Sequence, residues 1–197
     1  MSVENRYDHL VELGGSDYKI VDGEPNIKGW TVKTNTGRKI GTVDELLFEP
    51  ATRKVRYLVV DLDDNKMGVT EDKKVLIPIG LVNLYDDGEK QADINDARDP
   101  NADSVVIAND PDMNAAGYNP YNDGEVVTVP ATAEQLNWLP AYEKSNVTPA
   151  SETHIRRVFE GTGGEVLNIS DPAYNKDDFY IHVHFNDGRF NNRNKPL

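Results

Sequence analysis

The feature that most constrains the fold is a close succession of short strand-like segments with no helical pattern between them. Each segment is rich in β-branched or aromatic residues and ends near glycine, proline, asparagine or aspartate. The strongest segment, 55–62, is apolar on both faces, which is typical of a central strand. Short strands at this spacing favour a small antiparallel sheet or barrel. The predicted strands cover residues 29–34, 39–48, 55–62, 74–78 and 81–85.

Two glycines fit this interpretation. Gly37 lies between two predicted strands, where a tight reversal needs the backbone freedom that glycine has. Gly41 lies inside a predicted strand and indicates a bend or bulge, which a small barrel needs in order to close.

Beyond residue 85 the strand pattern is interrupted by polar and turn-forming residues. We expect two further strands, at 104–107 and 125–129, which close or flank the sheet, and a long surface loop over 109–124. Thr132 and Gln135 have the spacing of a capping box and predict the start of a short helix.

Ser151 and Glu152 are expected to cap a second short helix, which ends at Gly161. Its apolar face would carry Ile155, Val158 and Phe159. The expected class is therefore all-β, a small antiparallel barrel with a few short helices and an irregular C-terminal extension. We divide the chain into a lead-in over 1–16 with one or two helical turns, a barrel-like domain with long acidic loops over 17–130, and an extension with a flexible tail over 131–197.

The charge balance excludes some classes of partner. The chain has 34 acidic residues against 21 Lys and Arg, a formal net charge of −13. Nucleic-acid backbones and anionic lipid surfaces both attract basic proteins, so neither is an expected partner. Without cysteine the chain forms no disulfide and offers no thiolate ligand. No secretory signal and no membrane-spanning apolar run is visible, so we expect a cytoplasmic protein without an integral membrane segment.

Four pieces of the sequence, in this order and spacing, resemble the PRC-barrel family. They are IKGWTV at 27–32, GRKIGTVDELL at 37–47, RKVRYLVV at 53–60 and KVLIPI at 74–79. With the later piece AEQLNWLPAY at 133–142, the chain is similar to soluble bacterial proteins that resemble the H subunit of the photosynthetic reaction centre. The resemblance implies a barrel that acts as an assembly or docking module, with no shared catalytic residue. It also implies peripheral association with a photosynthetic or respiratory membrane complex.

The best chemical candidate is a pair of histidines, His182 and His184. On a strand, positions i and i+2 share a face, so a strand over 179–185 would direct both imidazoles at one metal ion. Asp177, Asp178 and Asp187 are the nearby candidates for a third ligand. The alternative is two half-exposed histidines that alternate with Ile181, Val183 and Phe185 on a polar strand.

The acidic loops offer a weaker possibility of cation binding. The segments that begin at Asp61 and Asp110 open like a calcium loop, but both lack its glycine and its final glutamate, so at most a loosely held surface cation is expected. Tyr118 and Tyr121 fit either loop self-packing or an interface.

We therefore expect a non-enzymatic interaction or assembly module that needs no cofactor and binds a protein partner or itself, through sheet edges or the C-terminal segment. The sequence contains neither a nucleophile elbow nor a phosphate-binding loop, so we do not expect an enzyme. The alternative is a metal- or small-ligand-binding protein that uses His182 and His184 or the acidic loops. His9 and His154 are isolated in the sequence, and Trp30 and Trp138 are interpreted as packing residues.

Overall fold

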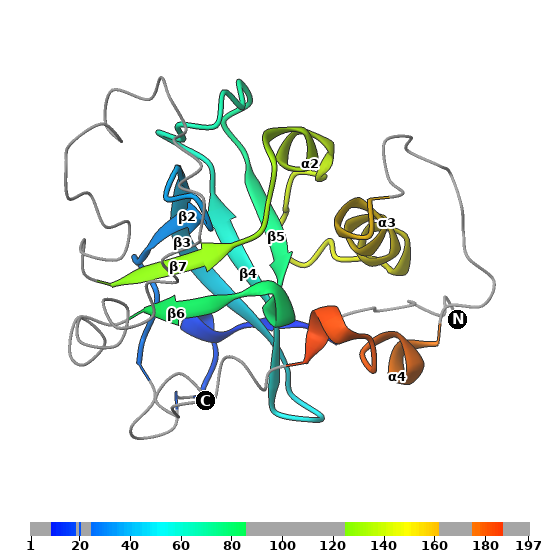
Figure 1. The fold of residues 1–197 in the computed structure, drawn as a ribbon. Coiled ribbons are helices and arrows are strands. Elements are labelled where there is room, and N and C mark those ends of the chain that lie inside the picture. Colours follow the sequence, from blue (N-terminus) through cyan, green and yellow to red (C-terminus); the bar gives the residue numbers. More distant parts are fainter. Residues whose placement is uncertain (1–8, 19, 21–24, 86–124, 162–174, 187–197) are drawn as a thin grey trace, which may run out of the picture.

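The structure is a computed structural model and describes residues 9–18, 20, 25–85, 125–161 and 175–186 (Figure 1). Its described strands form one sheet in the order β5-β4-β3-β2-β7-β6, with β1 beside β3. Helices α2 and α3 lie side by side beyond β5 (Figure 1). The strands are β1 (Val11–Glu12), β2 (Thr31–Thr34), β3 (Lys39–Glu49), β4 (Lys54–Asp61), β5 (Lys74–Pro78), β6 (Asn83–Tyr85) and β7 (Val126–Val129).

The helical elements among the described residues are short and mostly follow the sheet in the chain. Three are α-helices: α2 (Ala133–Trp138), α3 (Pro149–Phe159) and α4 (Lys176–Phe179). Three are single 3-10 turns: η1 (Leu13–Gly15), η2 (Ile79–Leu81) and η3 (Val183–Phe185). No helix among the described residues is both long and apolar enough to cross a membrane.

The sheet confirms the predicted strand-rich fold but corrects the expectation that it is purely antiparallel. Strands β2 to β5 pair antiparallel with their neighbours along the chain, whereas β2 and β7 pair parallel. Short turns impose an antiparallel direction, but β7 follows β2 after a long stretch of chain that leaves either direction open. In the described part of the chain no pairing joins β5 to β6, so the closure of a barrel is not confirmed.

Gly41 lies at the predicted irregularity. The register between β2 and β3 shifts so that Val32 faces Gly41 and Lys33 faces Lys39, which leaves Ile40 as an extra residue. A Cβ atom at Gly41 would lie 1.9 Å from the carbonyl oxygen of Asp61, so only glycine fits this close approach. The bulge bends β3, which pairs with β2 near its start and with β1 near its end.

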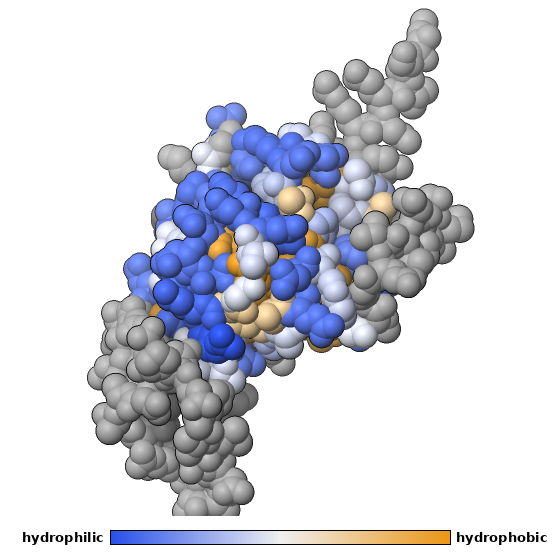
Figure 2. Space-filling view, turned by 90° about the horizontal axis from the view of Figure 1, so that it is seen from above, coloured by the Kyte–Doolittle hydropathy of each residue, from blue (hydrophilic) through white to orange (hydrophobic). Residues whose placement is uncertain are grey.

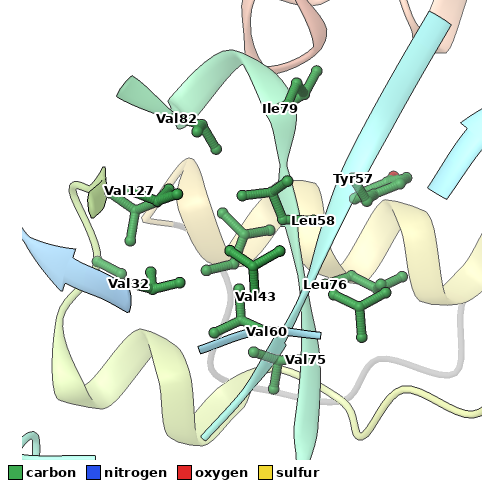
Figure 3. Close-up of a cluster of buried hydrophobic side chains, with 14 of the residues drawn as sticks. Val32, Val43, Tyr57, Leu58, Val60, Val75, Leu76, Ile79, Val82 and Val127 are labelled. Atoms are coloured by element: carbon green, nitrogen blue, oxygen red, sulfur yellow. The ribbon is translucent and has the colours of Figure 1, made fainter. Parts of the chain in front are cut away.

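The core is centred on β4, as its two-faced apolar pattern predicts. Tyr57, Leu58, Val59 and Val60 are completely buried. Figure 3 shows Tyr57, Leu58 and Val60 among side chains from neighbouring elements, and burying each large apolar side chain stabilises the fold by roughly 1.5–3 kcal/mol. The labelled neighbours include Val32, Val43, Val75, Leu76, Ile79, Val82 and Val127.

The segments after the sheet contribute to this same core. Leu136, Ile155 and Phe185, from α2, α3 and η3, belong to one apolar cluster with the strands. Trp30 is also buried there, and Trp138 packs against the cluster, in agreement with their interpretation as packing residues.

The start of α2 confirms the predicted capping box, and the start of α3 corrects a prediction. Thr132 accepts from the amide of Gln135, whose side chain accepts from the amide of Thr132. The cap of helix α3 is Thr148, three residues before the predicted cap Ser151, and the helix itself begins at Pro149. Ser151 instead completes the capping box at the start of α3. Proline favours the first helical position because its φ angle is already helical, and this places the start at Pro149.

The expected strand over 179–185 is wrong: the segment consists of α4, a turn and η3. Local hydrogen bonds favour this conformation, because Phe179 N–H donates to the carbonyl of Asn175 and Phe185 N–H to that of His182. Of the lead-in predicted to hold one or two helical turns, the described residues form β1 and the single 3-10 turn η1, while residues 1–8 lie outside the described residues. The strand at 104–107, the loop over 109–124 and the tail from 187 lie outside the described residues.

Candidate interaction surface

Residues 175–186, which we call the C-terminal turn, are fitted closely against the end of the sheet. Its 3-10 turn η3 packs on η2, which connects β5 to β6. A Cβ atom at Gly80 in η2 would lie 2.4 Å from the carbonyl oxygen of Val183 and 2.6 Å from the carbonyl carbon of His184. Because two stretches of backbone meet here, the side chain at position 80 must be absent.

Three aromatic side chains anchor the C-terminal turn: Phe179, Tyr180 and Phe185, all buried. The ring of Phe185 lies edge-on to Tyr57 of β4, with centroids 5.3 Å apart. The guanidinium of Arg56 lies 4.3 Å from the centroid of the Tyr180 ring. Such ring and cation contacts each add about 0.5–1.5 kcal/mol to the free energy gained by burial.

A buried polar group lies at the same junction. The carboxyl group of Glu152 in α3 is completely buried, and its Oε1 accepts from the hydroxyls of Tyr57, at 3.0 Å, and Tyr180. His9 Nε2 lies 3.3 Å from Glu152 Oε2 and 2.9 Å from the Tyr180 hydroxyl. We call these four residues the Glu152 cluster. It connects the N-terminal segment, β4, α3 and the C-terminal turn, and its hydrogen bonds offset the cost of burying a carboxyl group.

A buried ion pair between Arg56 and Glu49 lies beside the Glu152 cluster. Arg56 donates from Nη2 and Nε to Glu49 Oε2, at 2.7 and 3.2 Å, and Thr52 donates its hydroxyl to the same oxygen. This pair holds the Arg56 guanidinium in position over the Tyr180 ring.

The structure brings His182 and His184 together, although not on a strand. Their ring centroids are 4.5 Å apart. His182 Nδ1 accepts from the backbone N–H of His184 at 3.3 Å, and its Nε2 lies 3.2 Å from Glu160 Oε1. Both nitrogens of His182 are therefore engaged within the protein, whereas Nδ1 of His184 is buried without a hydrogen-bond partner among the described residues.

The candidate third ligands do not join the two histidines in the described structure. Asp178 lies in α4 and accepts from the side chain of Asn175, while nothing is described for the side chain of Asp177 or for Asp187. Across the described ranges, no group of three or more His, Cys, Asp or Glu residues is arranged to hold a metal ion. Metal binding by His182 and His184 therefore stays a prediction.

The environment of His184 favours its neutral form. Burial lowers the pKa of the His184 imidazole below its ordinary value of 6.5, and the nearby His182 and Arg156 lower it further, while Glu160 opposes them. A proton on His184 would thus introduce a charge into a site that already lies beside Arg156.

Two apolar side chains of the C-terminal turn point outward. Ile181 is 80% exposed and Val183 is 64% exposed. Hydrophilic residues dominate the described part of the face in Figure 2. The only other large apolar side chain exposed in the described part of the chain is Tyr18, which packs on Phe48. Ile181 and Val183, flanked by anchored aromatics, are the strongest candidate contact surface.

The acidic loop after β4 is closed by its own hydrogen bonds. The Asn65 side chain donates to the carbonyls of Leu62 and Val69 and accepts from two backbone amides. The carboxylates of Asp61 and Asp64 face Lys74 and Lys39. The second loop, from Asp110, and the tyrosines at 118 and 121 lie outside the described residues.

Sequence reasoning missed the Glu152 cluster, although one signal was present. Glu152 lies three residues before Ile155 and seven before Phe159, so it falls on the apolar face of the predicted helix. A glutamate on such a face indicates a buried polar partner. Nothing in the sequence indicated that His9, isolated near the start, would be that partner.

Comparison with known proteins supports the resemblance for part of the chain. Over 52 residues the chain is 42% identical to an uncharacterized protein of Deinococcus radiodurans, a match that covers 26% of this chain and 18% of that protein. Residues 24–99, which hold β2 to β6, match the model of the PRC-barrel domain.

Proposed function

We propose that the protein is a non-enzymatic interaction or assembly module built on a PRC-barrel domain. The match over 24–99 supports a general module. The Glu152 cluster supports a structural role, because its carboxyl group is completely buried and its hydrogen bonds join four parts of the chain. A catalytic carboxyl group would need access to a substrate.

The observation that carries this proposal is the exposure of Ile181 and Val183 on an anchored turn. The neighbouring Phe179, Tyr180 and Phe185 hold the backbone of the turn against the core. A surface that is already ordered loses little conformational entropy on binding. Two apolar side chains on such a surface therefore contribute more to the binding free energy than they would on a flexible segment. We propose that the partner covers these two side chains.

The finer identity of the module is part of the proposal. We propose that it is H-subunit-like, acts in the bacterial cytoplasm and binds a protein partner, or associates with itself, at the periphery of a membrane complex. The net charge of −13 supports a protein partner over nucleic acid or an anionic lipid surface.

Capture from the native host tests the proposal. We would compare the full chain with Ile181→Ser/Val183→Ser, using differential isotope labels and gentle cross-linking. Tyr18→Ser is the matched control, because it also removes an exposed apolar side chain. The proposal expects a partner, or a second copy, that the wild type and the control retain and the double variant loses. Equal recovery by all three chains would contradict it.

A second candidate function is metal or small-ligand binding, favoured by the 4.5 Å approach of the two imidazole rings and by the unpartnered Nδ1 of His184. It requires His182 to give up the amide of His184 or the carboxylate of Glu160. Elemental analysis and a thermal shift with added Zn²⁺ test it. The shift should vanish in His182→Ala/His184→Ala, and a metal-free chain with no shift would contradict it.

A further inference from the structure

The surface beneath the C-terminal turn has the properties of a binding site for a short aromatic segment. Four of the residues that contact the turn form what we call the acceptor surface: Arg56, Tyr57, Gly80 and Glu152. They offer a guanidinium, an aromatic edge, a glycine that admits close backbone approach, and a buried acceptor for a hydroxyl. They come from β4, η2 and α3, all outside the turn that they hold.

The C-terminal turn matches this surface group by group. Tyr180 places its ring against Arg56 and its hydroxyl on Glu152, and Phe185 places its ring against Tyr57. The backbone at Val183 and His184 covers Gly80. These contacts join residues far apart in sequence, so the turn is docked by the acceptor surface as well as shaped by its local hydrogen bonds.

The link between α3 and the turn is long enough for the turn to reach another molecule. Residues 162–174 separate the last described residue after α3 from the turn, a stretch of 13 residues. A chain of that length spans at most about 45 Å, whereas a compact domain of this size has a radius of gyration of about 16 Å. The turn can therefore dock on its own domain or on that of a neighbour.

We propose that the acceptor surface also binds the C-terminal turn of a second copy of this chain. The contacts are identical whether the turn docks within its own chain or on a second copy. The link alone therefore sets the equilibrium between these two arrangements. A tethered segment has an effective concentration on the order of millimolar, so each chain keeps its own turn at micromolar concentration. Exchange becomes dominant when docking within one chain is blocked. The inference uses the buried side chains of the turn, so it is independent of Ile181 and Val183.

Two full-length variants test this by complementation. Tyr180→Ala/Phe185→Ala disables the turn and leaves the acceptor surface intact. Gly80→Val disables the acceptor surface, because its side chain collides with the backbone at Val183, and leaves an intact, undocked turn. Each variant alone should be monomeric, and an equimolar mixture at tens of micromolar should form a 1:1 complex in size-exclusion chromatography with light scattering. Two folded variants that stay monomeric when mixed would overturn the proposal.

The chemistry of the complex has its own control. Adding Tyr180→Phe to the Gly80→Val chain removes the hydroxyl that donates a hydrogen bond to Glu152. Losing a hydrogen bond to a buried carboxyl group is costly enough that we expect Kd to rise roughly tenfold or more. An unchanged Kd would contradict binding at the acceptor surface.

A measurement on the wild type keeps the proposal testable if either variant fails to fold. A synthetic peptide of residues 175–186 at millimolar concentration should displace the chain's own turn and increase deuterium uptake at residues 179–185. The same peptide with Tyr180→Ala and Phe185→Ala should not. Identical uptake with both peptides would overturn the proposal.

Discussion

The hydroxyl of Tyr180 donates to the buried carboxyl group of Glu152, 28 residues earlier in the chain. This bond joins the C-terminal turn to α3, and through Tyr57 to the central strand β4. The PRC-barrel match ends at residue 99, yet the apolar core formed by the matched strands also includes side chains as far along the chain as Phe185. The later segments are therefore structural parts of the domain and its candidate interaction surface.

Glu152→Gln should destabilise the protein by about 1–3 kcal/mol. Its amide oxygen can still accept from both tyrosine hydroxyls, but an NH2 donor would replace the carboxylate oxygen that faces His9 Nε2. Glu134→Gln is the matched control: Glu134 is also an acid in the first turn of a helix but is exposed. It should lose only its interaction with the helix dipole, about 0.5 kcal/mol. Urea unfolding measures both, and equal losses would show that the cluster contributes nothing.

Two positions in the C-terminal turn should respond very differently to truncation. Phe185→Ala removes a ring that is 2% exposed and should cost about 3–5 kcal/mol. Ile181→Ala removes a side chain that is 80% exposed and should change stability by less than about 0.5 kcal/mol. Thermal unfolding of both variants checks this contrast. If Phe185→Ala unfolds like the wild type, the turn is not docked as described.

Two glycines give a matched test of the contact between η2 and η3. Added Cβ atoms at Gly80 and Gly14 would each lie 2.4 Å from an oxygen. At Gly80 that oxygen belongs to the backbone of Val183, whereas at Gly14 it ends the flexible side chain of Glu45. Gly80→Ala should therefore increase hydrogen exchange across residues 179–185, and Gly14→Ala should leave it unchanged. Equal exchange in both variants would contradict the close packing.

Stability should fall in mild acid because of His184. Its pKa is lower in the folded state than its ordinary value of 6.5, so the unfolded chain binds the proton more readily. The free energy of unfolding should start to decrease as the pH falls through 6.5 and continue until the pH passes the folded-state pKa. His184→Gln should flatten this decrease between pH 7.5 and 5.5, as measured by urea midpoints. If the stability of both chains fell equally with decreasing pH, His184 would not be the cause of the decrease.

Much of the sheet could be predicted because its signals are local. Alternation, turn residues and the two-faced pattern of β4 locate strands within a residue or two, and Gly41 marks the bulge. The parallel pairing of β2 with β7 could not be predicted, because no local signal fixes the relative direction of strands so far apart. The start of α3 was misplaced because Ser151 and Thr148 are both good caps, and Pro149 decides between them.

The site was less predictable, because it depends on contacts between distant segments. Alternation of Ile181 and Val183 with histidines suggested a strand, but both are exposed while Phe179, Tyr180 and Phe185 are buried. The pairing of His9 with Glu152 and Tyr180 depends on how both ends of the chain dock on the sheet. Sequence spacing carries no information about such docking.

We propose that Ile181 and Val183 form the contact with a protein partner. The most direct measurement places a photo-cross-linking amino acid at position 181 in the native host, and at the exposed Thr70 in the loop after β4 as control. We expect a discrete adduct at position 181, with a partner or a second copy, and none at position 70. The absence of any adduct at position 181, or the same adducts at both positions, would contradict it.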